Sequence, residues 1–176
     1  SDDLLVKEGE IGEIVVKGDV VTRSYFNRPE KTKLAKINND DGSIHHRMGD
    51  VGRFDEKGRL WFCGRKAHRV ETTKGPLFTV PCEAVFNVHP KIFRTALVGF
   101  GEEGKKRPVI CVELEKLHRA CDEDSLRKEL LDIAQKQEHT KSIDTFLFHS
   151  SFPVDVRHNA KINRELLTEW AKEQLT

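Results

Sequence analysis

Two apolar segments constrain the fold of this chain more than any other feature. Residues 94–100 (RTALVGF) and 107–115 (RPVICVELE) are short and rich in β-branched side chains, a composition that favours buried strands. The charged stretch at 102–106 (EEGKK) between them is typical of an exposed turn. The two segments therefore predict neighbouring strands of one small sheet.

Helices are expected to cover this sheet. Residues 123–137 have helical periodicity, with Asp122 or Asp124 as the cap. A shorter helix is expected at 81–89, capped by Thr79, and another strand at 145–150. The apolar positions expected to face the sheet are Leu126, Leu130, Ile133 and Ala134 in the long helix, and Leu166, Leu167, Trp170 and Ala171 in the last helix.

The N-terminal part has a different pattern, with short apolar runs separated by glycines. Residues 49–65 predict a β-hairpin that turns at DEKG, and residues 9–21 predict two short strands. The stretches 24–33 and 38–46 are expected to be loops, and a smaller hairpin is expected around Lys74-Gly75.

The composition changes at Gly64-Arg65, which predicts two parts. Residues 1–64 are expected to form a β-rich piece that is too short and too rich in strands to be stable as a separate domain. Residues 65–176 are expected to form a compact α+β unit, with a mostly antiparallel sheet packed against helices. The chain begins at Ser1 without a methionine, and we interpret it as a fragment of a longer protein.

Charge and hydropathy exclude several classes of function. Thirty basic and 29 acidic residues leave a net charge of +1, so nothing in the overall charge favours nucleic acid as a partner. No apolar run approaches the roughly 20 residues of a membrane span. Four cysteines lack metal-site spacing and are expected to be reduced residues of a cytoplasmic protein. They are Cys63, Cys82, Cys111 and Cys121.

Four kinds of polar feature are candidates for chemistry. Asp50 lies between two glycines and could accept hydrogen bonds from a diol, or could simply be a turn aspartate. Arg65 could bind phosphate or ribose oxygens, or could be a surface arginine. Lys161 follows the loop-like stretch 156–160 and could bring a cation to a phosphate, or could be surface decoration. Metal binding is not expected, because three histidines have no further ligand at convincing spacing. They are His45, His46 and His68.

The order of four stretches is more informative than any single residue. Residues 9–32 (GEIGEIVVKGDVVTRSYFNRPEKT), 49–66 (GDVGRFDEKGRLWFCGRK), 80–99 (VPCEAVFNVHPKIFRTALVG) and 152–167 (FPVDVRHNAKINRELL) resemble, in this order, the last third of the adenylate-forming superfamily. That superfamily includes acyl- and aryl-CoA synthetases, nonribosomal peptide adenylation domains and luciferases. The resemblance covers nearly the whole chain.

The resemblance implies a role for each candidate residue. Asp50 would bind the ribose hydroxyls of ATP, and Arg65 would help to hold the nucleotide. Lys161 would be the catalytic lysine that bridges the substrate carboxylate and the nucleotide during adenylation. Residues 1–64 would be the end of the large N-terminal domain, and residues 65–176 its mobile C-terminal lid, with Ala67 at the hinge position. Mg²⁺ would be bound mainly by parts of the enzyme upstream of this chain.

Five departures from the superfamily pattern narrow the sub-class. Ala67 replaces the usual Asp or Lys of the hinge, Met48 the usual Thr or Ser, and Ala160 the usual Gly. Pro153 lies two residues farther from Lys161 than in the usual pattern. The spacing of Gly75 from the other motifs is also slightly shifted. In thioester-forming relatives this glycine lies on the loop that lines the CoA tunnel. The combination is most similar to the β-lactone synthetases of bacterial long-chain olefin biosynthesis, which need no CoA.

The sequence therefore predicts part of an ATP-dependent, AMP-forming ligase that converts a long-chain β-hydroxy acid to a β-lactone. The β-hydroxyl group would displace AMP within the same molecule, because proximity supplies its effective concentration. A CoA-using fatty acyl-CoA ligase and a non-catalytic binding module are the alternatives. Association with other olefin-pathway enzymes is an open possibility, and the 176-residue piece alone is expected to be inactive.

Overall fold

The structure is a computed structural model that describes residues 5–155 and 161–176. The chain divides into two compact units, Ser1–Ala67 and His68–Thr176, and each is described by itself. The division lies three residues after the expected boundary between Gly64 and Arg65. Helices and mostly antiparallel sheets make up the chain, so the predicted α+β class is confirmed.

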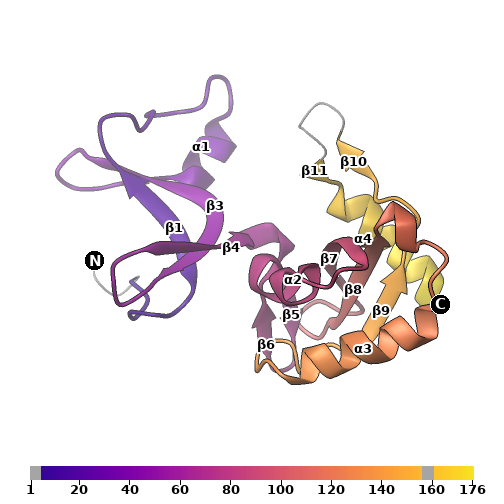
Figure 1. The fold of residues 1–176 in the computed structure, drawn as a ribbon. Coiled ribbons are helices and arrows are strands. Elements are labelled where there is room, and N and C mark those ends of the chain that lie inside the picture. The colour runs from indigo at the N-terminus through magenta and orange to yellow at the C-terminus, as the bar shows by residue number, and fades with distance from the viewer. Residues whose placement is uncertain (1–4, 156–160) are drawn as a thin grey trace. The chain divides into compact units, whose positions relative to one another are not determined.

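The first unit is built around one long strand. Its elements are β1 (Gly12–Lys17), α1 (Pro29–Ala35), β2 (Lys36–Asn38), β3 (Ile44–Phe54) and β4 (Leu60–Arg65). Strand β3 pairs antiparallel with β1 along one edge, and with β2 and β4 near its two ends on the other edge (Figure 1). The hairpin predicted at 49–65 is therefore present, as β3 and β4, although β3 begins earlier than expected.

Three expectations for the first unit are wrong. The stretch 24–33 was expected to be a loop, but Pro29 begins helix α1, where its fixed φ suits the first turn. The stretch 38–46 contains the start of β3 at Ile44, because β1 and β2 supply partners for this backbone. Residues 9–21 contain one strand, β1, rather than two, since the chain turns at Gly18, whose carbonyl accepts a hydrogen bond from the amide of Val21.

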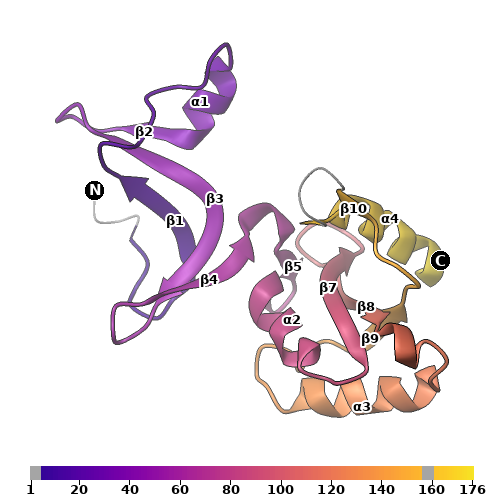
Figure 2. The ribbon, with the colours of Figure 1, turned by 45° about the horizontal axis from the view of Figure 1, so that its top comes forward.

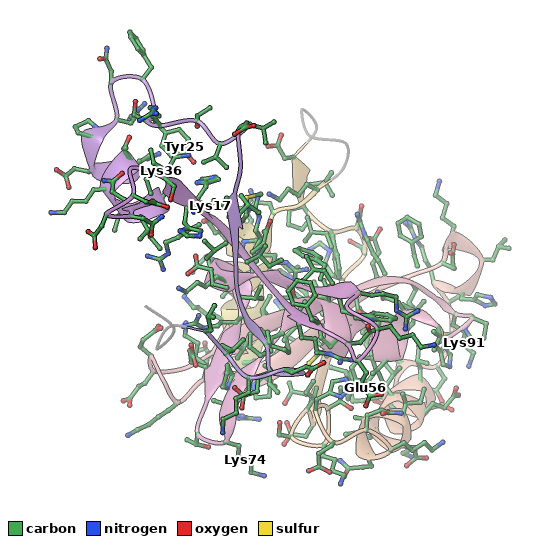
Figure 3. All side chains as sticks on the ribbon, turned by 90° about the vertical axis from the view of Figure 1, so that its left-hand side faces the viewer. Lys17, Tyr25, Lys36, Glu56, Lys74 and Lys91 are labelled. Carbon is green, nitrogen blue, oxygen red and sulfur yellow. The ribbon has the colours of Figure 1, made fainter. Side chains whose placement is uncertain are left out.

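The first unit has little interior. Val51 and Cys63 are the buried apolar residues among those the structure describes in this unit. The buried ammonium group of Lys36 donates to Thr22 Oγ1 (3.2 Å) and lies 5.4 Å from the centre of the Tyr25 ring (Figure 3). Large apolar side chains, among them Val20 and Phe26, remain exposed.

The second unit is a three-stranded sheet with helices on both faces (Figures 1 and 2). Its order is β7-β8-β9, with β7 and β8 antiparallel and β8 and β9 parallel. The elements are β5 (Val70–Thr72), β6 (Gly75–Leu77), α2 (Thr79–Asn87), β7 (Ile92–Phe100), β8 (Arg107–Leu114), α3 (Glu123–Gln135), β9 (Thr145–Phe148), β10 (Val154–Asp155), β11 (Lys161–Ile162) and α4 (Arg164–Leu175). Short 3₁₀ turns lie at Lys66–His68 and Lys116–His118.

Alternation along the strands divides the core of the second unit in two. Leu97 and Ile110 point to a cluster formed with α2 and α3, which includes Phe86. Their neighbours Ala96 and Val109 point to the opposite face, where α4 packs. This period of two residues is what a sheet covered on both faces requires. Both core clusters consist of residues from the second unit.

The caps of α2 and α3 and the buried face of α4 agree with the sequence-based expectations in part. Asp122 caps α3 by accepting a hydrogen bond from the amide of Asp124 (3.1 Å). Thr79 does not cap α2: Phe78 occupies the cap position, and Thr79 is the buried first residue of the helix. Leu166 was expected on the buried stripe of α4, but 57% of it is exposed. The face of α4 that packs on the sheet buries Leu167 and Ala171 and partly buries Trp170.

All four cysteines are free thiols, and three of them are buried. Within residues 5–155 and 161–176, no helix has both the length and the apolar character needed to cross a membrane.

Candidate functional site

Asp50 and Arg65 are brought together by the register of the first unit's sheet. The two residues are direct partners across β3 and β4. Arg65 Nη1 lies 3.0 Å from Asp50 Oδ1, and the same nitrogen donates a hydrogen bond to the Met48 carbonyl oxygen (3.2 Å). The Asp50 side chain is 21% exposed and the Arg65 side chain 47%. The guanidinium group therefore lies over a carboxylate that is largely withdrawn from water.

The glycines around Asp50 explain the local path of β3. Gly49 has a φ of +69°, a left-handed conformation that costs a residue with a Cβ more than it costs glycine. A Cβ on Gly52 would lie 2.8 Å from the carbonyl oxygen of Trp61 in β4. Asp50 lies inside β3, between a glycine that permits the backbone conformation and one that permits close strand pairing.

One oxygen of Asp50 lacks a hydrogen-bond donor. Asp50 Oδ1 is the buried side-chain polar atom, among those the structure describes, that has no hydrogen-bond partner. The contact with Arg65 is an ion pair without hydrogen-bond geometry, and the same Nη1 group donates to the carbonyl oxygen of Met48. Buried acceptors without donors are rare and costly, so each one needs an explanation. A donor supplied by a ligand would satisfy this oxygen.

A second carboxylate, that of Glu13, holds Lys66, the residue that follows Arg65. Glu13 Oε2 in β1 accepts hydrogen bonds from Lys66 Nζ (2.7 Å) and from Arg47 Nη2 (2.6 Å). Burial raises the pKa of Glu13, but the hydrogen bonds and charges of Arg47 and Lys66 outweigh it, so the pKa is lowered overall. The first residue of the 3₁₀ turn that contains Ala67 is thereby anchored to β1. Ala67 is also the last residue of the first unit.

Lys161 belongs to the second unit. It is an exposed residue at the start of β11 and is the register partner of Asp155 in β10. Asn163 caps α4 by accepting a hydrogen bond from the amide of Leu166 (3.2 Å), so the lysine lies directly before a helix, as expected. The expected loop at 156–160, including the departure at Ala160, lies outside the described residues.

The sequence analysis missed two buried ion pairs of the second unit. Glu83 in α2 binds Arg164 in α4, and Glu113 in β8 binds Arg94 in β7. A signal was present for the two glutamates, because the residues directly before and after each of them are apolar. No metal-binding group of three or more His, Cys, Asp or Glu side chains occurs in the described part of the chain.

Solved structures identify the fold. ATP-bound MatB from Rhodopseudomonas palustris matches with a TM-score of 0.77 and 24% identity, over 97% of this chain and 32% of that one. The o-succinylbenzoate CoA synthetase MenE from Bacillus subtilis, in complex with an acyl-adenylate intermediate, matches with a TM-score of 0.73 and 24% identity, over 92% of this chain and 31% of that one. The fold is that of adenylate-forming enzymes. No protein-family model matches the chain.

Sequence comparison gives the family more closely. Over 170 residues the chain is 54% identical to the olefin β-lactone synthetase of Xanthomonas campestris pv. campestris, and over 171 residues 52% identical to that of Stenotrophomonas maltophilia. These matches cover 94% and 95% of this chain, and 31% of each relative. The chain belongs to the adenylate-forming superfamily, as the resemblance implied. It spans about a third of the length of these relatives.

Proposed function

We propose that this chain is part of an ATP-dependent acid-activating enzyme that produces a β-lactone. The first unit is the β-rich end of its large domain, and the second unit is its mobile lid, with the hinge at Ala67. Two observations support this arrangement. The division into compact units falls directly after Ala67, and both apolar core clusters belong to the second unit.

The observation that carries the nucleotide site is the unsatisfied oxygen of Asp50. A carboxylate can accept hydrogen bonds from two vicinal hydroxyl groups, and bonds to a charged acceptor are stronger than neutral ones. Asp50 Oδ1 is buried and lacks a donor, so the ribose hydroxyls of ATP would supply what the folded chain does not. Arg65, half-exposed beside it, is available to the same nucleotide through its remaining N–H groups.

Lys161 acts on the reacting groups in this proposal. An ammonium group on a long stem can follow negative charge as it moves from the substrate carboxylate to the leaving pyrophosphate. Its position at the start of β11, exposed and directly before α4, leaves the side chain accessible to a partner surface. Mg²⁺ would accompany ATP and be held mainly by residues upstream of this chain.

The reaction is proposed in two steps. The acid's carboxylate oxygen attacks the α-phosphorus of ATP and pyrophosphate leaves, which gives an acyl adenylate. The β-hydroxyl oxygen then forms a bond to the acyl carbon, the bond from that carbon to AMP breaks, and the hydroxyl proton is lost to solvent. A long-chain β-hydroxy acid is the substrate that fits this product. The similarity to two olefin β-lactone synthetases supports this sub-class over other activations of acids.

Two alternatives remain distinguishable from this proposal. A CoA ligase is favoured by 34% identity over 102 residues to the 2-succinylbenzoate–CoA ligase of Bacillus mycoides. A non-catalytic binding module would keep the fold without turnover. Location in the cytoplasm is part of the proposal and is supported by the free thiols. Association with further olefin-pathway enzymes is part of the proposal through the sequence similarity to two olefin β-lactone synthetases.

The test uses the full-length enzyme with ATP, Mg²⁺ and a long-chain β-hydroxy acid, with and without CoA. Mass spectrometry of the products should show a β-lactone and AMP in both reactions. A matched acid without the β-hydroxyl group should form the adenylate and no lactone. An acyl-CoA thioester formed only when CoA is present would instead establish the ligase, and absence of AMP release under all conditions would establish the binding module.

A further inference from the structure

We propose that Glu83 and Arg164 are positioning residues that orient Lys161 for adenylation. This inference rests on the function proposed above, because it assigns these residues a role that acts through the lysine. Neither side chain contacts the proposed substrates in this scheme. Both belong to the second unit, so the inference needs no knowledge of how the two units lie relative to each other.

The two side chains form a bidentate pair inside the second unit. Arg164 Nη1 lies 2.7 Å from Glu83 Oε1, and Nη2 lies 3.0 Å from Oε2. The pair is also bound to the backbone of Leu97 in β7, whose amide donates to Glu83 Oε1 (2.7 Å) and whose carbonyl accepts from Arg164 Nη1 (3.2 Å). The side chains are 11% and 16% exposed. Helix α2, strand β7 and the first residue of α4 are therefore joined at one point.

This junction lies three residues after the lysine along the chain. Arg164 opens α4, and the preceding Asn163 caps the helix and donates its own amide to the carbonyl of Pro153 (2.8 Å). Ile162 is packed against the core cluster under α4 and pairs with Val154 across β10 and β11. The backbone leading from the ion pair to Lys161 is thus held at each step, and Figure 2 shows β10 beside the start of α4.

The other strand of this hairpin is held in a similar way. Glu113 Oε2 in β8 accepts hydrogen bonds from the amide of Phe152 (3.0 Å) and from Arg94 Nε (2.7 Å). Phe152 lies directly before Pro153 and is itself buried. Two buried carboxylates, one for each strand, therefore fix the base of the β10–β11 hairpin to the sheet.

The chemistry of the Glu83–Arg164 pair suits a role in orienting the neighbouring chain segment better than a role in stabilising the fold. A buried ion pair is weak evidence for stability, since well-packed apolar residues of similar volume often do as well or better. A guanidinium fork on a carboxylate, however, fixes direction as well as distance. A catalytic cation needs such a fixed direction, because a displacement of about 1 Å can cost roughly a hundredfold in rate. The pair supplies this direction for the chain segment that carries Lys161.

A double-mutant cycle in the full-length enzyme tests the proposal. The four proteins are the wild type, Glu83→Gln, Lys161→Ala and the double variant. The measurements are pyrophosphate release at saturating ATP and acid, and the KM for ATP. Glu83→Gln keeps the size of the side chain and an acceptor for Leu97 but removes the charge. We expect it to lower kcat by roughly tenfold to a hundredfold with little change in KM.

The two proposals fail in different ways in this cycle. If Glu83 acts through Lys161, adding Glu83→Gln to Lys161→Ala should have little further effect on kcat. An equal loss in both backgrounds, or equal losses in kcat and in the amount of folded enzyme, would overturn the positioning role and leave the proposed function standing. Normal turnover of Lys161→Ala would overturn the role of Lys161 and, with it, the positioning role, whereas absence of pyrophosphate release by the wild type would overturn the proposed function.

The control and the fallback variant come from the same unit. The control is Glu129→Gln, which removes the charge of another paired carboxylate. Glu129 lies in α3 and binds His89 and Lys91 rather than the β10–β11 hairpin, so this variant should leave kcat unchanged. If Glu83→Gln is recovered unfolded, Arg164→Lys enters the same cycle, because lysine keeps the charge and loses the fork. A normal kcat for Arg164→Lys would overturn the proposal.

Discussion

Asp50 and Arg65 face each other across β3 and β4 with their charged atoms 3.0 Å apart, yet Asp50 Oδ1 still lacks a hydrogen-bond donor. The arginine donates instead to the carbonyl oxygen of Met48. Arg65 therefore balances the charge of this carboxylate, while its hydrogen bond goes to the backbone. In the function proposed above, the ribose hydroxyl groups of ATP would donate hydrogen bonds to Asp50 Oδ1.

Asp50→Asn in the full-length enzyme is expected to weaken ATP binding. Hydrogen bonds to a charged acceptor contribute about 1.5–3 kcal/mol, so the dissociation constant should rise roughly tenfold to a hundredfold. Isothermal titration with ATP measures the change. Glu56→Gln, at the exposed hairpin turn of the same unit (Figure 3), is the matched control and should bind ATP as the wild type does. Equal affinities for the Asp50 variant and the wild type would remove this carboxylate from the site.

Lys161→Ala is expected to lower the adenylation rate while ATP binding is much less affected. A cation that stabilises charge in the transition state contributes mainly to kcat, and the loss of one such group costs on the order of a hundredfold to a thousandfold. Pyrophosphate release from a β-hydroxy acid and ATP is the assay. Lys172→Ala, an exposed lysine on α4 paired with Glu169, should keep full activity. Unchanged turnover of the Lys161 variant would contradict its proposed role.

Residues 1–176 by themselves should not catalyse the reaction. They would carry Asp50, Arg65 and Lys161, but catalysis by positioning requires both sides of a closed site. Isothermal titration should show at most weak ATP binding. Incubation with ATP and a long-chain β-hydroxy acid should release no AMP above background, and robust release would show that this piece contains a complete active site.

Stability of the second unit should fall at alkaline pH through its buried thiols. Burial raises the pKa of Cys82 and of Cys111 from 9.0 to about 12. Below pH 9 the two thiols are protonated in the folded and in the unfolded chain. Between pH 9 and 12 they lose their protons only in the unfolded chain, so the free energy of unfolding decreases as pH rises. Each thiol contributes up to about 1.4 kcal/mol per pH unit.

Urea unfolding of this chain at several pH values between 8 and 11 measures the effect. Cys111→Ala should show a shallower decrease than the wild type, because one of the two thiols is gone. The comparison of the two proteins cancels the contributions that they share. Identical slopes would show that Cys111 ionises equally in the folded and unfolded chains.

Phe86→Ala should destabilise the second unit by about 3–5 kcal/mol. Phe86 is fully buried, and its ring lies 5.3 Å from that of Phe146 in an edge-to-face arrangement. The substitution would leave a cavity between α2 and the sheet. Urea unfolding measures the loss, and Leu117→Ala, at a highly exposed position, should change stability by less than about 0.5 kcal/mol. Similar midpoints for both variants would show that the Phe86 site collapses without cost.

The sequence by itself determined the elements whose pattern is local. Strands β7 and β8 follow from two β-branched runs with a charged turn between them, and the β3–β4 hairpin from its DEKG turn. Helix α3 follows from its apolar period and from an aspartate cap at 122 or 124, of which the structure uses Asp122. The adenylate-forming family followed from the order of four motifs. The signals for these strands and this helix each lie within a few residues, where backbone sterics and side-chain periodicity decide the outcome, whereas the family followed from a resemblance along most of the chain.

The tertiary structure decided what depends on distant partners. Ile44 begins a strand because β1 and β2 offer hydrogen bonds to a segment whose own composition favours a turn. Leu166 is exposed because the sheet covers only part of the apolar stripe of α4. Asp50 with Arg65, and Glu83 with Arg164, are separated by 15 and 81 positions. Such pairs form only when register and packing have brought the charges together, since no local pattern selects one charged partner over another.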